Sequence, residues 1–191
     1  MKSAVILGAS GSVGRVVTQH FSKLGWRVFC LDIAHPPALP PNTSYIPVDH
    51  AILSDDAQLH SKITAKLPPL SLVFSVAGGW VGGGAKSSSF CSDVQLCMRQ
   101  NITSARVPAF VTIACYYRHL LQAAAAGAIG SKLLLPNGLL VLTGSTAGLL
   151  PSSSMIAYST SKAALHHMVR CWLTPGPSLH PRGRVDALLI L

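Results

Sequence analysis

Tyr158 and Lys162 are separated by three residues, in a segment whose apolar residues recur at helical spacing. Side chains four positions apart project from one face of a helix, so this spacing predicts an ammonium group beside a phenol. A nearby cation favours the ionised form of a phenol, and a tyrosine so placed can donate a proton near neutral pH. The same spacing is also that of an ordinary pair on a helix surface. The rest of the chain must decide between the two.

A strand and a glycine turn at the start of the chain could position a cofactor for this chemistry. Residues 3–7 are apolar with a β-branched centre, as in a buried parallel strand. Residues at helical spacing follow until Gly25, namely Val13, Val16, Val17, Phe21 and Leu24. Glycines let a backbone approach a pyrophosphate, and the N–H groups of a helix N-terminus bind anions. The pattern predicts a dinucleotide site formed by Gly8, Ser10, Gly11, Val13 and Gly14.

An acidic residue ends the next apolar run. Residues 27–31 read as a second strand, and Asp32 lies 18 positions after Gly14. A carboxylate at this place can accept a hydrogen bond from a ribose 2'-hydroxyl and would repel a 2'-phosphate. The sequence therefore predicts NADH as the cofactor in preference to NADPH.

Ser145 completes a set of residues that is typical of one family. It lies thirteen positions before Tyr158, at the end of the apolar run 138–143. Serine, tyrosine and lysine at this spacing, behind a glycine-rich turn, resemble the short-chain dehydrogenase/reductase family. The resemblance implies that Ser145 hydrogen-bonds the reacting oxygen, that Tyr158 gives the proton, and that Lys162 holds the ribose and assists the tyrosine. The hydride would come from the nicotinamide cofactor.

The remaining apolar runs predict one α/β domain over residues 1–191. We expect a Rossmann-type, doubly wound parallel sheet of about six strands with helices on both faces. Further strands are expected near 44–48, 70–76, 138–143 and 184–191, and helices carrying Leu59, Ile63 and Leu67, over 92–121, and from Tyr158 onward. Family members continue with a loop that anchors the nicotinamide, a substrate lid and a last strand. The sequence lacks these parts, so it resembles a truncated form.

Two polar residues have more than one interpretation. Asp49 follows the third predicted strand, where the family often places a carboxylate near the adenine amino group, but it could equally cap the next helix. Asn101 lies on the helix predicted over 92–121. The resemblance implies that it holds a water in a proton relay ending at Lys162, and an ordinary polar helix residue is the alternative.

The loop after the fourth predicted strand narrows the family resemblance. Ala77, Gly78, Gly79 and Trp80 stand where the family usually has Asn-Asn-Ala-Gly. This segment resembles that of quinonoid dihydropteridine reductases, where it lies beside the cofactor and its tryptophan adjoins the pterin pocket. Glycines admit a flat ring to the backbone, and an indole can stack on a planar heterocycle. The alternative is a glycine-rich loop with a packing tryptophan.

Composition limits the other classes of function. The net charge is +9, but the fifteen basic residues are spread along the chain without a basic run interleaved with aromatics, so no nucleic-acid partner is expected. No apolar run reaches the ~20 residues of a membrane helix, and we expect a cytoplasmic protein without a membrane partner. The histidines show no i, i+4 pair and the five cysteines no Cys-x-x-Cys pair, so no metal site is expected.

Three functions are compatible with these residues. The first is NADH-dependent reduction of quinonoid dihydropteridine to tetrahydropteridine by a homodimer, in which the helices at 92–121 and after Tyr158 pair as the resemblance implies. The second is a short-chain carbonyl reductase with another small substrate, because animal dihydropteridine reductases commonly have alanine in place of Ser145 and lack an asparagine matching Asn101. The third is a catalytically impaired NADH-binding chain that pairs with another subunit.

Overall fold

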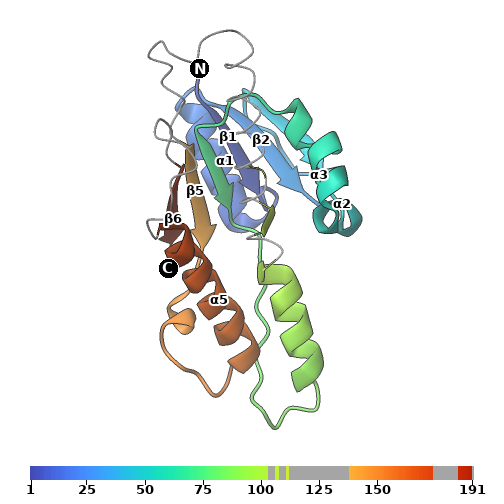
Figure 1. The fold of residues 1–191 in the computed structure, drawn as a ribbon. Helices are drawn as coiled ribbons and strands as arrows, with labels where there is room; N and C mark the ends of the chain where they lie inside the picture. Colours follow the sequence, from blue (N-terminus) through green and yellow to red (C-terminus); the bar gives the residue numbers. More distant parts are fainter. Residues whose placement is uncertain (103–105, 108–110, 112–137, 174–184, 191) are drawn as a thin grey trace.

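The fold is a parallel sheet of six strands in the order β3-β2-β1-β4-β5-β6 (Figure 1). The computed structural model describes residues 1–102, 106–107, 111, 138–173 and 185–190. The strands are β1 (Ser3–Leu7), β2 (Arg27–Asp32), β3 (Thr43–Pro47), β4 (Leu72–Ser75), β5 (Gly138–Thr143) and β6 (Val185–Ile190). This order, with parallel pairing throughout, confirms the Rossmann-type fold that the sequence predicts.

Helices connect the strands on both sides of the sheet. The described helices are α1 (Ser12–Lys23), α2 (His50–Ser54), α3 (Asp56–Lys62), residues 90–102, and α5 (Ile156–Leu173), with 3-10 turns η1 (Thr64–Lys66) and η2 (Thr146–Gly148). Figure 1 shows helix 90–102 and α5 side by side, extending beyond the carboxyl end of the sheet. The rest of the helix predicted over 92–121 lies mostly outside the described residues, as does the segment 122–137. Of the described helices, none is long and apolar enough to cross a bilayer.

Alternate residues of the central strands fill two cores. Val5 and Leu7 of β1 pack with Leu165 and Val169 of α5 on one face. Ala4 and Ile6 lie on the other face, in clusters that Phe21 of α1 joins. Successive side chains of a strand point to opposite faces, and full burial of a valine or leucine contributes about 1.5–3 kcal/mol to folding. Both faces of the sheet are therefore covered, which holds the strand ends in fixed positions.

The buried face of α1 differs from the one that the sequence predicts. Val13, Val16 and Leu24 are exposed, and the fully buried positions are small residues at a spacing of four, namely Gly14, Thr18 and Ser22. A Cβ on Gly14 would lie 2.0 Å from the carbonyl oxygen of Gly8, so the first turn of α1 is too close to the strand end for a larger side chain. Of the predicted apolar residues, Val17 and Phe21 are half-buried and pack against the core, while proximity to the sheet selects the small residues at the closest positions.

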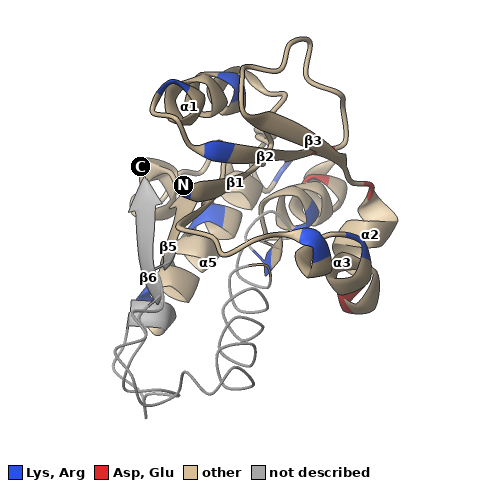
Figure 2. Cartoon of the chain, turned by 90° about the horizontal axis from the view of Figure 1, so that it is seen from above, with Lys and Arg blue, Asp and Glu red and all other residues tan. Residues whose placement is uncertain are grey.

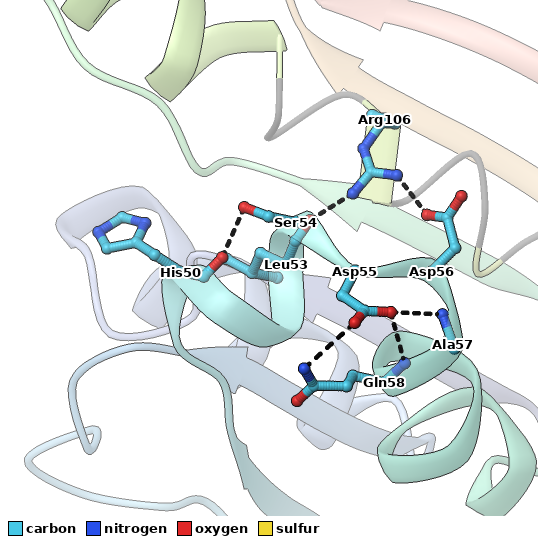
Figure 3. Close-up of polar contacts among 8 residues, drawn as sticks. All are labelled: His50, Leu53, Ser54, Asp55, Asp56, Ala57, Gln58 and Arg106. Carbon is cyan, nitrogen blue, oxygen red and sulfur yellow. Dashed lines mark hydrogen bonds and ion pairs between the residues drawn. The ribbon is translucent and has the colours of Figure 1, made fainter.

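Caps and one ion pair fix the short helices that follow β3 (Figure 3). The carboxylate of Asp49 accepts the backbone N–H of Ile52 at 2.7 Å, and Asp55 accepts those of Ala57 and Gln58. Asp49 is therefore an N-cap, which is one of its two predicted roles. Arg106 pairs with Asp56 and also donates to the carbonyl of Leu53, so it ties α2 and α3 to the helical segment that includes residue 106. We expected a helix through Leu67, but α3 ends at Lys62.

Basic side chains are dispersed over the described part of the chain. Figure 2 shows Lys and Arg on α1, at the start of β2, on α3 and on α5, with few acidic residues between them. No single helix or strand among the described ones gathers them into a stripe.

Candidate active site

The carboxyl ends of β1 and β4 meet at the point where the strand order reverses. The backbone N–H groups of Val76 and Ala77 both donate to the carbonyl oxygen of Leu7, at 2.9 and 3.1 Å. Gly8 has a φ of +86°, and a Cβ on it would lie 2.6 Å from the nitrogen of Ala77. Only glycine fits there, because both the backbone conformation and the proximity exclude a side chain. In open α/β sheets, ligands bind in the crevice at this topological switch point.

A cavity of about 560 Å³ opens at this crevice. Its lining includes six of the predicted cofactor residues, namely Gly8, Ser10, Gly11, Asp32, Ala77 and Gly78. Gly14 lies against the carbonyl oxygen of Gly8, in the turn itself. Val13 is exposed at the start of α1. The other predicted residues Asp49, Gly79, Tyr158 and Lys162 do not line the cavity. The structure therefore brings the two glycine segments together around one space, as the sequence predicts.

Asp32 connects the first glycine turn to the end of β2. One carboxylate oxygen accepts the backbone N–H of Ser10 at 2.7 Å, and the other accepts that of Ala34 at 3.2 Å. The hydroxyl of Ser10 in turn donates to the carbonyl of Ala34. These bonds fix a negative charge at the wall of the cavity, where it can accept a further hydrogen bond from a hydroxyl group.

Lys162 lies between the tyrosine and the cavity. Its Nζ is 5.7 Å from the ring centroid of Tyr158 and donates to the carbonyl oxygen of Thr143 at 2.8 Å. A Cβ placed on Gly78, which lines the cavity, would be 3.8 Å from the same Nζ. Lys162 is only 4% exposed, and burial lowers the pKa of its ammonium while the nearby Cys97 opposes that shift. Lys162 is thus buried on α5 close to Gly78, which lines the cavity, rather than being one of an ordinary pair on the helix surface.

Ser145 lies directly after β5 and caps η2. Its hydroxyl oxygen accepts the backbone N–H of Ala147 at 3.2 Å. Its own backbone N–H donates to Nε2 of His166 at 3.4 Å. Thr143, whose carbonyl accepts from Lys162, is the last residue of β5, and Ser145 follows two positions later. Both therefore contact α5 from the end of this strand.

Asn101 joins the glycine loop to α5. Its side-chain oxygen accepts the backbone N–H of Gly79 at 3.0 Å, and its Nδ2 donates to the Gly79 carbonyl at 3.0 Å and to the hydroxyl of Ser161 at 2.9 Å. Asn101 is fully buried. The structure gives this residue a bracing contact, whereas its predicted part in a proton relay stays a prediction.

A second connection between loop and helix is made by backbone alone. Gly83 pairs with Met155 in an isolated parallel bridge: the N–H of Gly83 donates to the carbonyl of Ser154 at 2.8 Å, and that of Ile156 donates back to Gly83. Trp80 lies in the loop between Gly79, which Asn101 binds, and Gly83, and it is 64% exposed. Its indole rests against Gly82, where a Cβ would be 2.9 Å from the ring. An exposed, supported indole is available for stacking.

Comparison with known proteins identifies the family. Residues 2–175 match the family model described as short chain dehydrogenase. The chain belongs to the short-chain dehydrogenase/reductase family. Within this family of oxidoreductases it is 31% identical over 175 residues to a dihydropteridine reductase of Dictyostelium discoideum. That match takes in 88% of the chain but 64% of the relative, so the chain spans less than two thirds of the relative's length.

Solved structures of the short-chain dehydrogenase/reductase family share the fold. A serine dehydrogenase from Escherichia coli has a TM-score of 0.69 at 20% identity, with 97% of this chain and 80% of that one covered. A family member from Burkholderia phymatum, solved in complex with NAD, has a TM-score of 0.68 at 21% identity, with 98% and 64% covered. A serine dehydrogenase complexed with NADP+ reaches 0.72 at 19% identity, with 98% and 71% covered. At these identities the likeness concerns the fold.

Several lining residues of the short-chain dehydrogenase cavity were not predicted. His50 follows β3, and Arg99 and Gln100 precede Asn101 on helix 90–102. The place of His50 after the third predicted strand was the available signal for that residue, whereas no signal marked Arg99 and Gln100 within the helix predicted over 92–121. His166 was also missed, although its spacing of four from Lys162 puts both on one face of α5. Among the described residues, no group of histidine, cysteine or acidic side chains could hold a metal ion.

Proposed function

We propose that the chain is an NADH-dependent reductase that converts quinonoid dihydropteridine to tetrahydropteridine. The observation that carries the proposal is the buried Lys162, whose Nζ lies 5.7 Å from the ring centroid of Tyr158 and close to Gly78, a residue that lines the cavity. The Dictyostelium relative supports the pterin substrate, as does an exposed Trp80 beside the same loop. The proposal extends to a homodimer in the cytoplasm, because the family resemblance implies pairing through two helices.

In the proposed reaction, bound NADH supplies the hydride. The two glycine segments admit the dinucleotide to the crevice, and Asp32 accepts a hydrogen bond from the adenosine ribose. Lys162 holds the nicotinamide ribose and places a positive charge beside Tyr158. Tyr158 donates a proton from its hydroxyl to the reduced substrate, so that one hydride and one proton are delivered. Trp80 stacks on the pterin ring.

Ser145 favours a second candidate, reduction of a carbonyl group on another small substrate. Its hydroxyl oxygen already accepts from Ala147, which leaves the O–H group able to donate to a reacting oxygen. A quinonoid pterin needs the same hydride and proton, so the serine is compatible with both candidates. The acceptor substrate separates them.

The test is NADH oxidation by the purified chain with chemically generated quinonoid dihydropterin, compared with a panel of ketones and aldehydes. We expect turnover of the pterin above the non-enzymatic rate, and Tyr158→Phe should lower kcat by about 10²-fold or more while NADH still binds, because only the proton donor is lost. Turnover of carbonyl compounds alone would favour the second candidate. A folded chain that binds NADH and turns over neither class would contradict both.

A further inference from the structure

His166 is a buried, titratable residue of α5 that the proposed reaction leaves unused. It lies one helical turn after Lys162 and two after Tyr158, so the three share a face of the helix. The side chain is 7% exposed, and its Nε2 is 3.4 Å from the backbone nitrogen of Ser145. We propose that His166 is a positioning residue, which fixes Ser145 for the reaction through this hydrogen bond.

The direction of the bond determines the state of the imidazole. A backbone N–H can only donate, so Nε2 of His166 must be unprotonated and the ring proton resides on Nδ1. Burial and the positive charge of Lys162 both lower the pKa of His166, in line with a neutral ring.

The serine is held at two atoms by this arrangement. His166 accepts from its backbone nitrogen, and the N–H of Ala147 donates to its hydroxyl oxygen. With both fixed, the hydroxyl hydrogen is the part of Ser145 that remains to be directed at a substrate oxygen. Without His166 the backbone N–H of Ser145 loses its acceptor, and the position of the Ser145 hydroxyl is no longer fixed through the backbone. The inference rests on the proposed function only in giving Ser145 a part in the reaction.

Single substitutions of His166 and His167 in the full chain test the inference. His166→Leu removes the acceptor, His166→Gln returns an acceptor at similar reach, and His167→Leu is a matched control because His167 is exposed on the same helix. We expect His166→Leu to lower kcat about tenfold with an unchanged KM for NADH, since small misplacements of reacting groups are costly. His166→Gln should recover most of the loss, and His167→Leu should have no effect.

A double-mutant cycle with Ser145→Ala separates this inference from the proposed function. If His166 acts through Ser145, His166→Leu will cause no further loss in the Ser145→Ala background. An equal loss in both backgrounds, or no loss in either, would overturn the inference. If Ser145→Ala alone leaves kcat unchanged, the serine's role in the proposed function fails instead.

Hydrogen exchange gives a readout that is independent of turnover. In NMR spectra, the Ser145 amide should exchange faster in His166→Leu than in the unmodified chain, while the amides of β5 keep their protection. Retained protection at Ser145 would overturn the inference even in a chain without measurable activity.

Discussion

At the scale of single residues, charge is placed sparingly around the cavity. Both carboxylate oxygens of Asp32 accept from backbone N–H groups, and Lys162 donates to the Thr143 carbonyl. The charges of Asp32 and Lys162 are therefore fixed in position before a ligand arrives, so little rearrangement of these two side chains is needed on binding. Changes at such positions should alter specificity or turnover.

Replacing Asp32 by serine should change the cofactor preference. The carboxylate would repel a 2'-phosphate, so Asp32→Ser should tighten NADPH binding at least about tenfold, equivalent to ~1.4 kcal/mol, and weaken NADH binding. Fluorescence titration with both cofactors measures this, and Asp55→Ser, at an exposed N-cap, is the control. An unmodified chain that already prefers NADPH would contradict the predicted role of Asp32.

Replacing Asn101 by leucine should destabilise the chain. The variant removes the partner of the half-buried N–H and carbonyl of Gly79 and one of two partners of the Ser161 hydroxyl, which still donates to the Tyr158 carbonyl. A polar group left unpaired costs about 1–3 kcal/mol when it is buried. Urea denaturation should show an unfolding free energy lower by about 3 kcal/mol. Gln95→Leu, at an exposed position of the same helix, should change it by less than about 0.5 kcal/mol. Equal stability of the two variants would refute the brace.

At the scale of elements, the first turn of α1 sets the closest approach in the fold. Gly14→Ala should destabilise the chain by about 1–3 kcal/mol, because its Cβ would lie 2.0 Å from the Gly8 oxygen and the helix must shift. Gly11→Ala is the matched control, since a Cβ there meets the same oxygen at 3.4 Å. Thermal denaturation without cofactor compares the two. Similar melting temperatures would show that α1 can move away at no cost.

The sequence predicted the strands better than the helix faces. Runs such as β1 and β5 are apolar throughout because both faces of a parallel strand are buried, so their bounds could be read directly. The fully buried positions of α1 could not be read from the sequence, because they are small residues that fit the short distance between the helix and the sheet. The end of α3 was likewise hidden, because Ile63 and Leu67 remain buried after the helix stops.

The site was predictable where a motif carried it. The two glycine segments, predicted to share a cofactor, meet at one crevice, and the spacing of Tyr158 and Lys162 predicted neighbours on one helix; their roles stay predictions. The contacts of Asn101 and His166 were not predictable in the same way, because their partners are backbone groups far along the chain. Such contacts leave no pattern of residue types in the sequence.

At the scale of the whole molecule, stability should depend on acid through His166. Its pKa in the folded chain lies below the ordinary 6.5, so the unfolded chain binds the proton first as pH falls. The unfolding free energy should therefore decrease below pH 6.5, by at most about 1.4 kcal/mol per pH unit for this one group. Urea denaturation at several pH values measures the slope.

Two variants assign that slope to a residue. His166→Gln should flatten the dependence below pH 6.5, because no group at this position then gains a proton on unfolding. His167→Gln, on the exposed side of α5, should leave it unchanged. A slope that survives His166→Gln would show that another group titrates on unfolding.

The bridge between Gly83 and Met155 bears on how such a protein can diversify. Its hydrogen bonds use only main-chain atoms, so the side chain at position 155 can change without releasing the loop from α5, whereas the φ of +133° at Gly83 favours glycine. Replacements around Trp80 would then reshape the surface presented to a substrate while the proton donor keeps its place. Substitutions around Trp80 can thus change the substrate while the proton donor and the main-chain bridge are retained.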